Sequence, residues 1–225
     1  MQVSVVIPVY DEEKTLEKIY QRVKNTNLVS EIIFINDGSQ DSTPEILEHF
    51  VNDPFVRVLH FSSNKGKGAA IKSGIKAANG EIIIIQDADL EYDPSEYPKL
   101  LKPFQDDITD VVFGSRFLNT KGHKFWYRIA NRFLTFLTNL LYHSKLTDME
   151  TGYKVFRKLI FDDLEIHANG FDFEPEFTAK VLKKKIPIHE VPISFNPRGY
   201  SEGKKIGMKD AVVAFWTLIK YRFVN

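Results

Sequence analysis

Two aspartates separated by a single residue, Asp87 and Asp89, carry the clearest chemistry in this chain of 225 residues. They follow an isoleucine-rich run, residues 82–85, whose continuous apolar character predicts a buried strand. Carboxylates at such a strand end supply the oxygen ligands that Mg²⁺ and Mn²⁺ prefer, and leave positions open for phosphate oxygens. Glu91 is a third candidate ligand. The same pattern occurs in solvated turns, so the preceding strand is what favours a metal site.

A further aspartate, Asp37, follows the apolar run 32–35 and precedes a glycine. A carboxylate at such a point can accept hydrogen bonds from a base or ribose. Asp-Gly-Ser is also ordinary turn chemistry, and both interpretations stay open. The segment 64–68, Asn-Lys-Gly-Lys-Gly, is similar to a phosphate-binding loop. Its spacing fits neither the P-loop nor the dinucleotide fingerprint, which argues against a Rossmann oxidoreductase.

A departing diphosphate needs positive charge, and arginine supplies it as a planar fork of donors. The candidates are Arg116, Arg128, Arg132, Arg198, Lys204 and Lys205. Arg198 lies in a glycine- and lysine-rich loop, residues 196–207, that we expect to become ordered over a ligand. Arg128 and Arg132 are four residues apart and share one side of a predicted helix.

Three carboxylates, Asp172, Glu174 and Glu176, precede another helical run. One of them could be a general base that deprotonates an acceptor hydroxyl. Carboxylates at a helix start also stabilise the helix dipole, so a structural role is equally open. The histidines show no metal-ligand spacing, and the absence of cysteine excludes disulfides and thiolate sites.

Strand-like apolar runs alternate with helical segments in the first half of the chain. The predicted strands are 3–9, 31–36, 56–61 and 82–86, and the predicted helices are 16–23, 43–50 and 69–78. This alternation predicts an α/β fold with a mostly parallel central sheet and helices on both faces. Its ligands then bind at the carboxyl ends of the strands.

The second half has longer helices and fewer strands. We predict strands at 110–114 and 191–195, a helix at 124–143 and a final helix at 209–223. In the helix at 124–143 the apolar positions Ile129, Phe133, Phe136, Leu137 and Leu140 follow helical spacing. One domain is expected over residues 1–208, followed by a C-terminal amphipathic helix at 209–225.

The charge distribution bears on partners. Thirty basic residues balance thirty acidic ones, so no global charge favours a nucleic-acid partner. The final helix combines an apolar stripe with basic residues. The stripe consists of Val212, Phe215, Trp216 and Ile219, and the basic residues are Lys209, Lys220 and Arg222. Such a helix suits an anionic membrane surface, or simply packs on its own domain. No run of about eighteen apolar residues occurs, so we expect a cytoplasmic protein, or one peripheral on the cytoplasmic face of a membrane.

Four segments in order, residues 5–12, 36–43, 64–70 and 87–89, resemble family 2 glycosyltransferases of the GT-A fold. Three later segments, 114–117, 148–157 and 190–193, look like the dolichyl-phosphate mannose synthase branch. The resemblance covers nearly the whole chain. It implies a nucleotide-diphospho-sugar transferase that depends on Mg²⁺ or Mn²⁺ and inverts the anomeric centre.

The substrates implied are a nucleoside-diphosphate sugar, GDP-mannose or a UDP-sugar, and a polyprenyl phosphate that receives mannose or glucose. The alternative acceptor is a saccharide hydroxyl, which needs a base such as Glu174, whereas a phosphate acceptor does not. A silent nucleotide-sugar-binding module is a third interpretation.

The resemblance also assigns residues. The donor would be held by Pro8, Tyr10, Glu12, Ile35, Asp37, Lys67, Asp87, Ala88, Asp89, Arg198 and Lys204. The metal would be held by Asp87, Asp89 and Glu91, and the acceptor phosphate by Arg116, Arg128 and Arg132. Catalysis would depend on Asp89, Arg116 and Arg198, with Glu174 as base for a hydroxyl acceptor.

Overall fold

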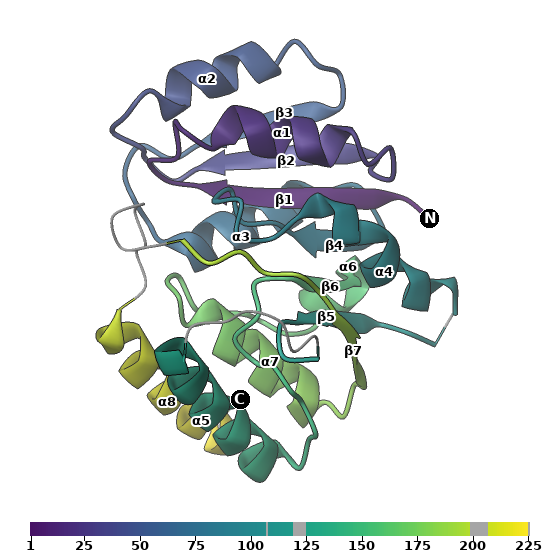
Figure 1. Ribbon diagram of the computed structural model, residues 1–225, viewed down its shortest axis with the longest axis vertical. Helices are drawn as coiled ribbons and strands as arrows, with labels where there is room; N and C mark the ends of the chain where they lie inside the picture. Colours follow the sequence, from purple (N-terminus) through teal and green to yellow (C-terminus); the bar gives the residue numbers. More distant parts are fainter. Residues whose placement is uncertain (107, 119–124, 199–206, 225) are drawn as a thin grey trace.

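A seven-stranded sheet forms the centre of the computed structural model, which describes residues 1–225 except 107, 119–124, 199–206 and 225. The strands are β1 (Val3–Val9), β2 (Glu31–Asn36), β3 (Val56–His60), β4 (Ile82–Ile85), β5 (Val111–Ser115), β6 (Lys154–Arg157) and β7 (Ile188–Pro192). Their order across the sheet is β3-β2-β1-β4-β6-β5-β7 (Figure 1). All pairs are parallel except those of β6, which runs antiparallel to both β4 and β5. The predicted mostly parallel α/β sheet is confirmed.

Helices cover both faces of this sheet. The helices are α1 (Leu16–Lys24), α2 (Thr43–Phe50), α3 (Lys67–Ala77), α4 (Tyr97–Leu101), α5 (Phe125–Tyr142), α6 (Lys158–Asp162), α7 (Phe173–Lys183) and α8 (Met208–Phe223), with 3-10 turns at Pro94–Glu96 and Lys102–Gln105. Val5 and Ile7 of β1 pack in one core with α1, while their neighbour Val6 packs on the other face with α3. Alternate side chains of one strand therefore enter two separate cores, as helices on both faces require.

Strand β6 is absent from the sequence-based prediction because charged residues stand at both of its ends. Lys154 begins it and is fully buried, since its ammonium donates to the carbonyls of Met149 (3.0 Å) and Thr151 (2.7 Å). Strand β7 starts three residues earlier than the predicted 191–195, because its register is set by pairing of Ile188 with Val111 of β5. It is an edge strand, where Pro192 costs no ladder hydrogen bond.

Helices α5 and α8 lie side by side near α7 (Figure 1). A third core joins them through Leu134 of α5, Ala179 of α7, and Ala214, Leu218 and Tyr221 of α8. The bulkier apolar residues of the predicted stripes point elsewhere: Phe133, Phe136, Leu140, Val212 and Trp216 are exposed. Helical spacing located the helices correctly, but the buried contacts of α5 and α8 are made by other positions, such as Leu134, Leu218 and Tyr221. Within the described residues no helix is long and apolar enough to cross a membrane.

Candidate active site

The predicted site residues come together at the carboxyl ends of β1, β2 and β4. These strands are parallel neighbours, so the segments that follow them emerge at one edge of the sheet. Tyr10 and Glu12 follow β1, Asp37 follows β2, and residues 87–91 follow β4. The segment after β7 is hydrogen-bonded to this edge, because the Asn196 amide donates to the Glu91 carbonyl at 2.9 Å.

Arg198 connects Glu12, which follows β1, with Asp89 and Glu91, which follow β4. Its guanidinium donates to both carboxylate oxygens of Glu12, at 3.0 and 3.1 Å, and to Oδ2 of Asp89 at 3.1 Å. Its backbone amide donates to Oε1 of Glu91 at 2.8 Å. Burial opposes the charge of Arg198, but hydrogen bonding to Glu12 and the charge of Asp89 raise its pKa above the ordinary value. Residues far apart in the sequence therefore form one connected cluster.

Asp89 lies in an electrostatically crowded position. Burial, followed by the charges of Asp87 and Glu91, raises the pKa of Asp89 to about 7, and Arg198 opposes this rise. Oδ1 of Asp89 also accepts the Glu91 amide at 3.0 Å. Like charges held out of water are what a bound divalent cation relieves, so the donor set fits Mg²⁺ or Mn²⁺. In the described part of the chain, no three acidic or histidine side chains already surround one point.

Lys67, at the start of α3, contacts two carboxylates. Its ammonium lies 2.7 Å from Oδ1 of Asp87 and 2.9 Å from Oε1 of Glu174. Burial opposes the charge, yet Asp87 and Glu174 raise the pKa of Lys67 well above its ordinary value. Lys67 therefore stays charged and fixes Asp87 relative to Glu174, the candidate base on α7. Sequence alone showed neither ion pair.

The other two acidic candidates of this segment have structural partners. Glu176 accepts the His167 amide at 2.9 Å and pairs with Lys180 at 2.9 Å. Asp172 accepts the Gly170 amide at 2.9 Å. These contacts leave Glu174 as the carboxylate of the three that joins the cluster around Asp87.

Asp37 organises the loop before α3. Its two carboxylate oxygens accept the backbone amides of Lys65 (2.7 Å) and Gly66 (2.9 Å). Gly66 has φ of 96°, and a side chain there would meet the backbone of Asn169, so glycine is required. The loop before α3 is thereby held at the carboxyl end of β2.

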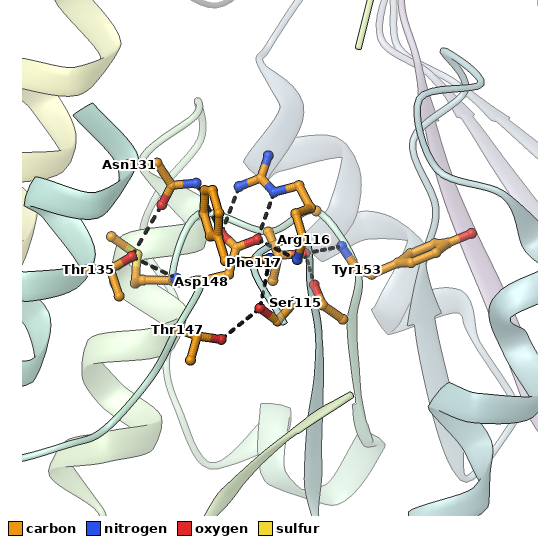
Figure 2. Close-up of polar contacts among 12 residues, drawn as sticks. Ser115, Arg116, Phe117, Asn131, Thr135, Thr147, Asp148 and Tyr153 are labelled. Atoms are coloured by element: carbon orange, nitrogen blue, oxygen red, sulfur yellow. Dashed lines mark hydrogen bonds and ion pairs between the residues drawn. The ribbon is translucent and has the colours of Figure 1, made fainter. Parts of the chain in front are cut away.

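Arg116 forms a second buried cluster after β5 (Figure 2). Its Nε and Nη2 each donate to Asp148 at 2.7 Å, and its backbone amide donates to the same carboxylate at 3.0 Å. Asn131 of α5 donates to Asp148 at 3.0 Å and accepts from Thr135 at 3.2 Å. Burial opposes ionisation, but the Arg116 charge keeps the pKa of Asp148 below its ordinary value. Asp148 begins the segment 148–157, on which part of the family resemblance rests, but its pairing with Arg116 was not predicted from the sequence.

The remaining predicted residues are distributed as follows. Pro8 and Ile35 lie in β1 and β2, and Ala88 is buried between the two aspartates. Arg132 is exposed on α5. The side chain of Arg128, together with Lys204, Lys205 and most of the predicted mobile loop, lies outside the described residues.

A mostly parallel sheet with carboxylates gathered at its strand ends is a feature of the nucleotide-diphospho-sugar transferase fold, GT-A. This chain belongs to that class and, within it, to glycosyl transferase family 2, whose model matches residues 4–165. The family resemblance expected from the sequence is thus confirmed.

Curated relatives carry more specific names. "Dolichol-phosphate mannosyltransferase" of Pyrococcus furiosus is 29% identical over 92% of this chain and 60% of its own length. The "UDP-N-acetylglucosamine–dolichyl-phosphate N-acetylglucosaminyltransferase" of Methanococcus voltae is 28% identical over 96% of this chain and 94% of its own. The chain therefore spans about three-fifths of the P. furiosus relative.

The fold likeness extends to solved structures. Glucosyl-3-phosphoglycerate synthase from Mycobacterium tuberculosis superposes with a TM-score of 0.76 at 18% identity, covering 100% of this chain and 81% of that chain. That enzyme was crystallised with Mn²⁺, UDP and glucosyl-3-phosphoglycerate. At this identity the likeness confirms the GT-A fold.

Proposed function

We propose that this chain transfers a hexose, with inversion, from a nucleoside-diphosphate sugar to a polyprenyl phosphate. The observation that carries the proposal is the ion pair between Glu174 and Lys67. The Lys67 ammonium already occupies one oxygen of Glu174 at 2.9 Å, and an acceptor that is already anionic needs no base. The names of the P. furiosus and M. voltae relatives, which refer to dolichyl phosphate, support this acceptor class.

The site residues divide into a donor half and an acceptor half. Asp87, Asp89 and Glu91 would hold Mg²⁺ or Mn²⁺, which when bound neutralises the diphosphate and eases its departure. Arg198 would donate its guanidinium hydrogen bonds to the diphosphate, while Lys67 pairs with Asp87 and fixes its position. The donor is GDP-mannose or a UDP-sugar, with its nucleoside held by residues that follow β1 and β2.

Arg116, with Arg128 and Arg132, binds the acceptor phosphate in this proposal. One phosphate oxygen attacks the anomeric carbon from the face opposite the diphosphate. The new carbon–oxygen bond forms as the bond to the diphosphate breaks, and the electron pair leaves with the nucleoside diphosphate. No proton has to be removed from the nucleophile.

Replacing Glu174 with glutamine distinguishes the two acceptor classes. With a phosphate acceptor, the Glu174→Gln variant should keep turnover within about threefold, because no base is used. With a saccharide hydroxyl, turnover should fall about 10²- to 10⁴-fold. Steady-state kinetics with each acceptor measures this, and titration of the donor checks that the Lys67–Asp87 pair still supports binding. A large turnover loss at unchanged donor affinity would contradict the phosphate acceptor.

We also propose that the chain lies on an anionic membrane surface, on the cytoplasmic face, where a polyprenyl phosphate is embedded. The outward faces of α5 and α8 expose Phe136 (63%) and Trp216 (62%), and stacking of Phe133 on Phe215 joins the two helices. Exposed basic residues flank these side chains, namely Arg132, Lys209, Lys220 and Arg222. Apolar side chains bordered by positive charge match a leaflet that contains anionic lipid.

The double variant Phe136→Ser, Trp216→Ser should reduce cosedimentation with anionic vesicles at least about tenfold, since each aromatic contributes ~1.5–3 kcal/mol when buried. The matched control is Phe55→Ser, an aromatic that is 56% exposed beside β3 at the opposite edge of the sheet. Point variants are preferable to deleting α8, because Leu218 and Tyr221 are buried against its neighbours. Equal sedimentation of all variants would remove the membrane proposal.

A further inference from the structure

A carboxylate oxygen without a partner lies at the centre of the site. Oε1 of Glu150 is inaccessible to solvent and accepts no hydrogen bond from the described residues. Burial and then the charge of Glu174 raise the pKa of Glu150 to about 7, while Lys154 and Arg116 oppose the rise. Nearly all buried acceptors in proteins have hydrogen-bond partners, so Oε1 of Glu150 is an acceptor that a donor group of a ligand would satisfy.

The turn that carries Glu150 connects the two halves of the site. Two residues before it, Asp148 binds Arg116, the acceptor-phosphate candidate. Two residues after it, Gly152 packs directly on the metal side, since a Cβ there would lie 2.5 Å from Oδ2 of Asp87. Glu150 therefore lies between the diphosphate half and the acceptor half.

This turn is held rigidly. The Lys154 ammonium donates to the carbonyls of Met149 and Thr151, on either side of Glu150. The Gly152 amide donates to the Tyr92 hydroxyl at 2.9 Å. Because the backbone is fixed from both sides, rotation of the Glu150 side chain is the movement that brings Oε1 to a ligand.

The inference rests on the proposed function. In an inverting transfer, the anomeric carbon lies between the leaving diphosphate and the attacking phosphate, so the hexose occupies the space between Asp87 and Arg116. We propose that Glu150 accepts a hydrogen bond from a hydroxyl of the transferred hexose and thereby helps to select the sugar. Glu150 would contribute to affinity for the sugar and not for the nucleoside diphosphate.

Calorimetric titration in saturating Mn²⁺ tests this without turnover. The probes are UDP-glucose, UDP-N-acetylglucosamine and GDP-mannose, each compared with UDP or GDP alone. The Glu150→Gln variant should bind the nucleoside diphosphates within twofold of wild type and bind the preferred nucleotide sugar about 10- to 100-fold more weakly. Its Tm should stay equal or rise, because an unpaired buried carboxylate is removed. The matched control is Glu165→Gln, which changes an exposed carboxylate.

Deoxy analogues of the preferred sugar identify the hydroxyl. One deoxy analogue should bind wild type more weakly by the same factor that Glu150→Gln costs, and should bind the Glu150→Gln variant no more weakly than the full sugar does. The Glu150→Asp variant keeps the charge on a shorter side chain, so it should lose only part of the affinity for the nucleotide sugar. If Glu150→Gln weakened the binding of nucleotide sugar and nucleoside diphosphate equally, or weakened neither, the proposed role of Glu150 would be overturned while the proposed function would stand. If wild type binds none of the three nucleotide sugars, the proposed function is overturned and this inference with it.

Discussion

Replacing Asp89 with asparagine is expected to abolish metal-dependent donor binding and to lower turnover by at least about a thousandfold, or ~4 kcal/mol of transition-state stabilisation. Two contacts are weakened at once. Asp89 is one of the three carboxylates that would ligate the cation, and it also accepts a hydrogen bond from Arg198 at 3.1 Å. An amide oxygen is a weaker ligand for a hard cation than a carboxylate. Titration of Mn²⁺ with UDP measures the first effect, and steady-state kinetics measures the second.

The matched control for this variant is Asp93→Asn in the same segment. Asp93 is partly exposed, caps a short turn through the Ser95 amide at 2.9 Å, and lies outside the carboxylate cluster. The Asp93→Asn variant removes the same charge four residues after Asp89, so the metal binding and turnover of this variant should stay near those of wild type. Full activity of Asp89→Asn would show that the metal and diphosphate bind elsewhere.

The second large effect is expected on folding. Asp148→Asn should lower the free energy of unfolding by about 3–5 kcal/mol, because the variant leaves the buried Arg116 guanidinium without its counter-charge. The pKa of Asp148 is lowered in the folded chain, so its stabilisation is complete above the ordinary pKa of aspartate and is lost as the pH falls below it. Urea unfolding at neutral pH, where the full effect is present, is the measurement.

A surface pair provides the comparison for Asp148. Asp53 pairs with Lys24 at 2.6 Å, but the lysine side chain is half exposed. Asp53→Asn should therefore cost at most about 1 kcal/mol. If Asp148→Asn and Asp53→Asn lowered the free energy of unfolding by similar amounts, the Arg116–Asp148 pair would contribute no more to stability than a surface pair does.

The first half of the fold was predictable from local pattern. The strand at 31–36 and the helix at 43–50 agree with the prediction residue for residue, because continuous apolar runs and the Ser-Thr-Pro helix start are local signals. Strand β6 was not predictable in this way. Lys154 has the appearance of a surface residue, and only carbonyls supplied by the preceding turn make its burial possible.

The candidate site, too, was predictable from local pattern only in part. The Asp-Ala-Asp pattern and the strand before it located the acidic cluster, and the loop setting of Arg198 identified the guanidinium that joins it. The partners of Lys67 and Arg116 depend on which strand ends become neighbours, so spacing along the chain contains no information about them. The sequence left open which side chains of α5 and α8 are buried, since hydrophobic periodicity does not say which side chains a neighbouring helix accommodates.

The central claim is metal-dependent transfer of a hexose to a polyprenyl phosphate, and one partition experiment tests it. Purified protein is incubated with Mn²⁺ or Mg²⁺, a short polyprenyl phosphate and labelled GDP-mannose, UDP-glucose or UDP-N-acetylglucosamine, and the label is then extracted into organic solvent. We predict that label from one donor enters the organic phase only when the metal is present, and that Asp89→Asn yields none. Label that stays in the aqueous phase while nucleoside diphosphate is released would contradict the lipid-phosphate acceptor, and the absence of any release would contradict glycosyl transfer itself.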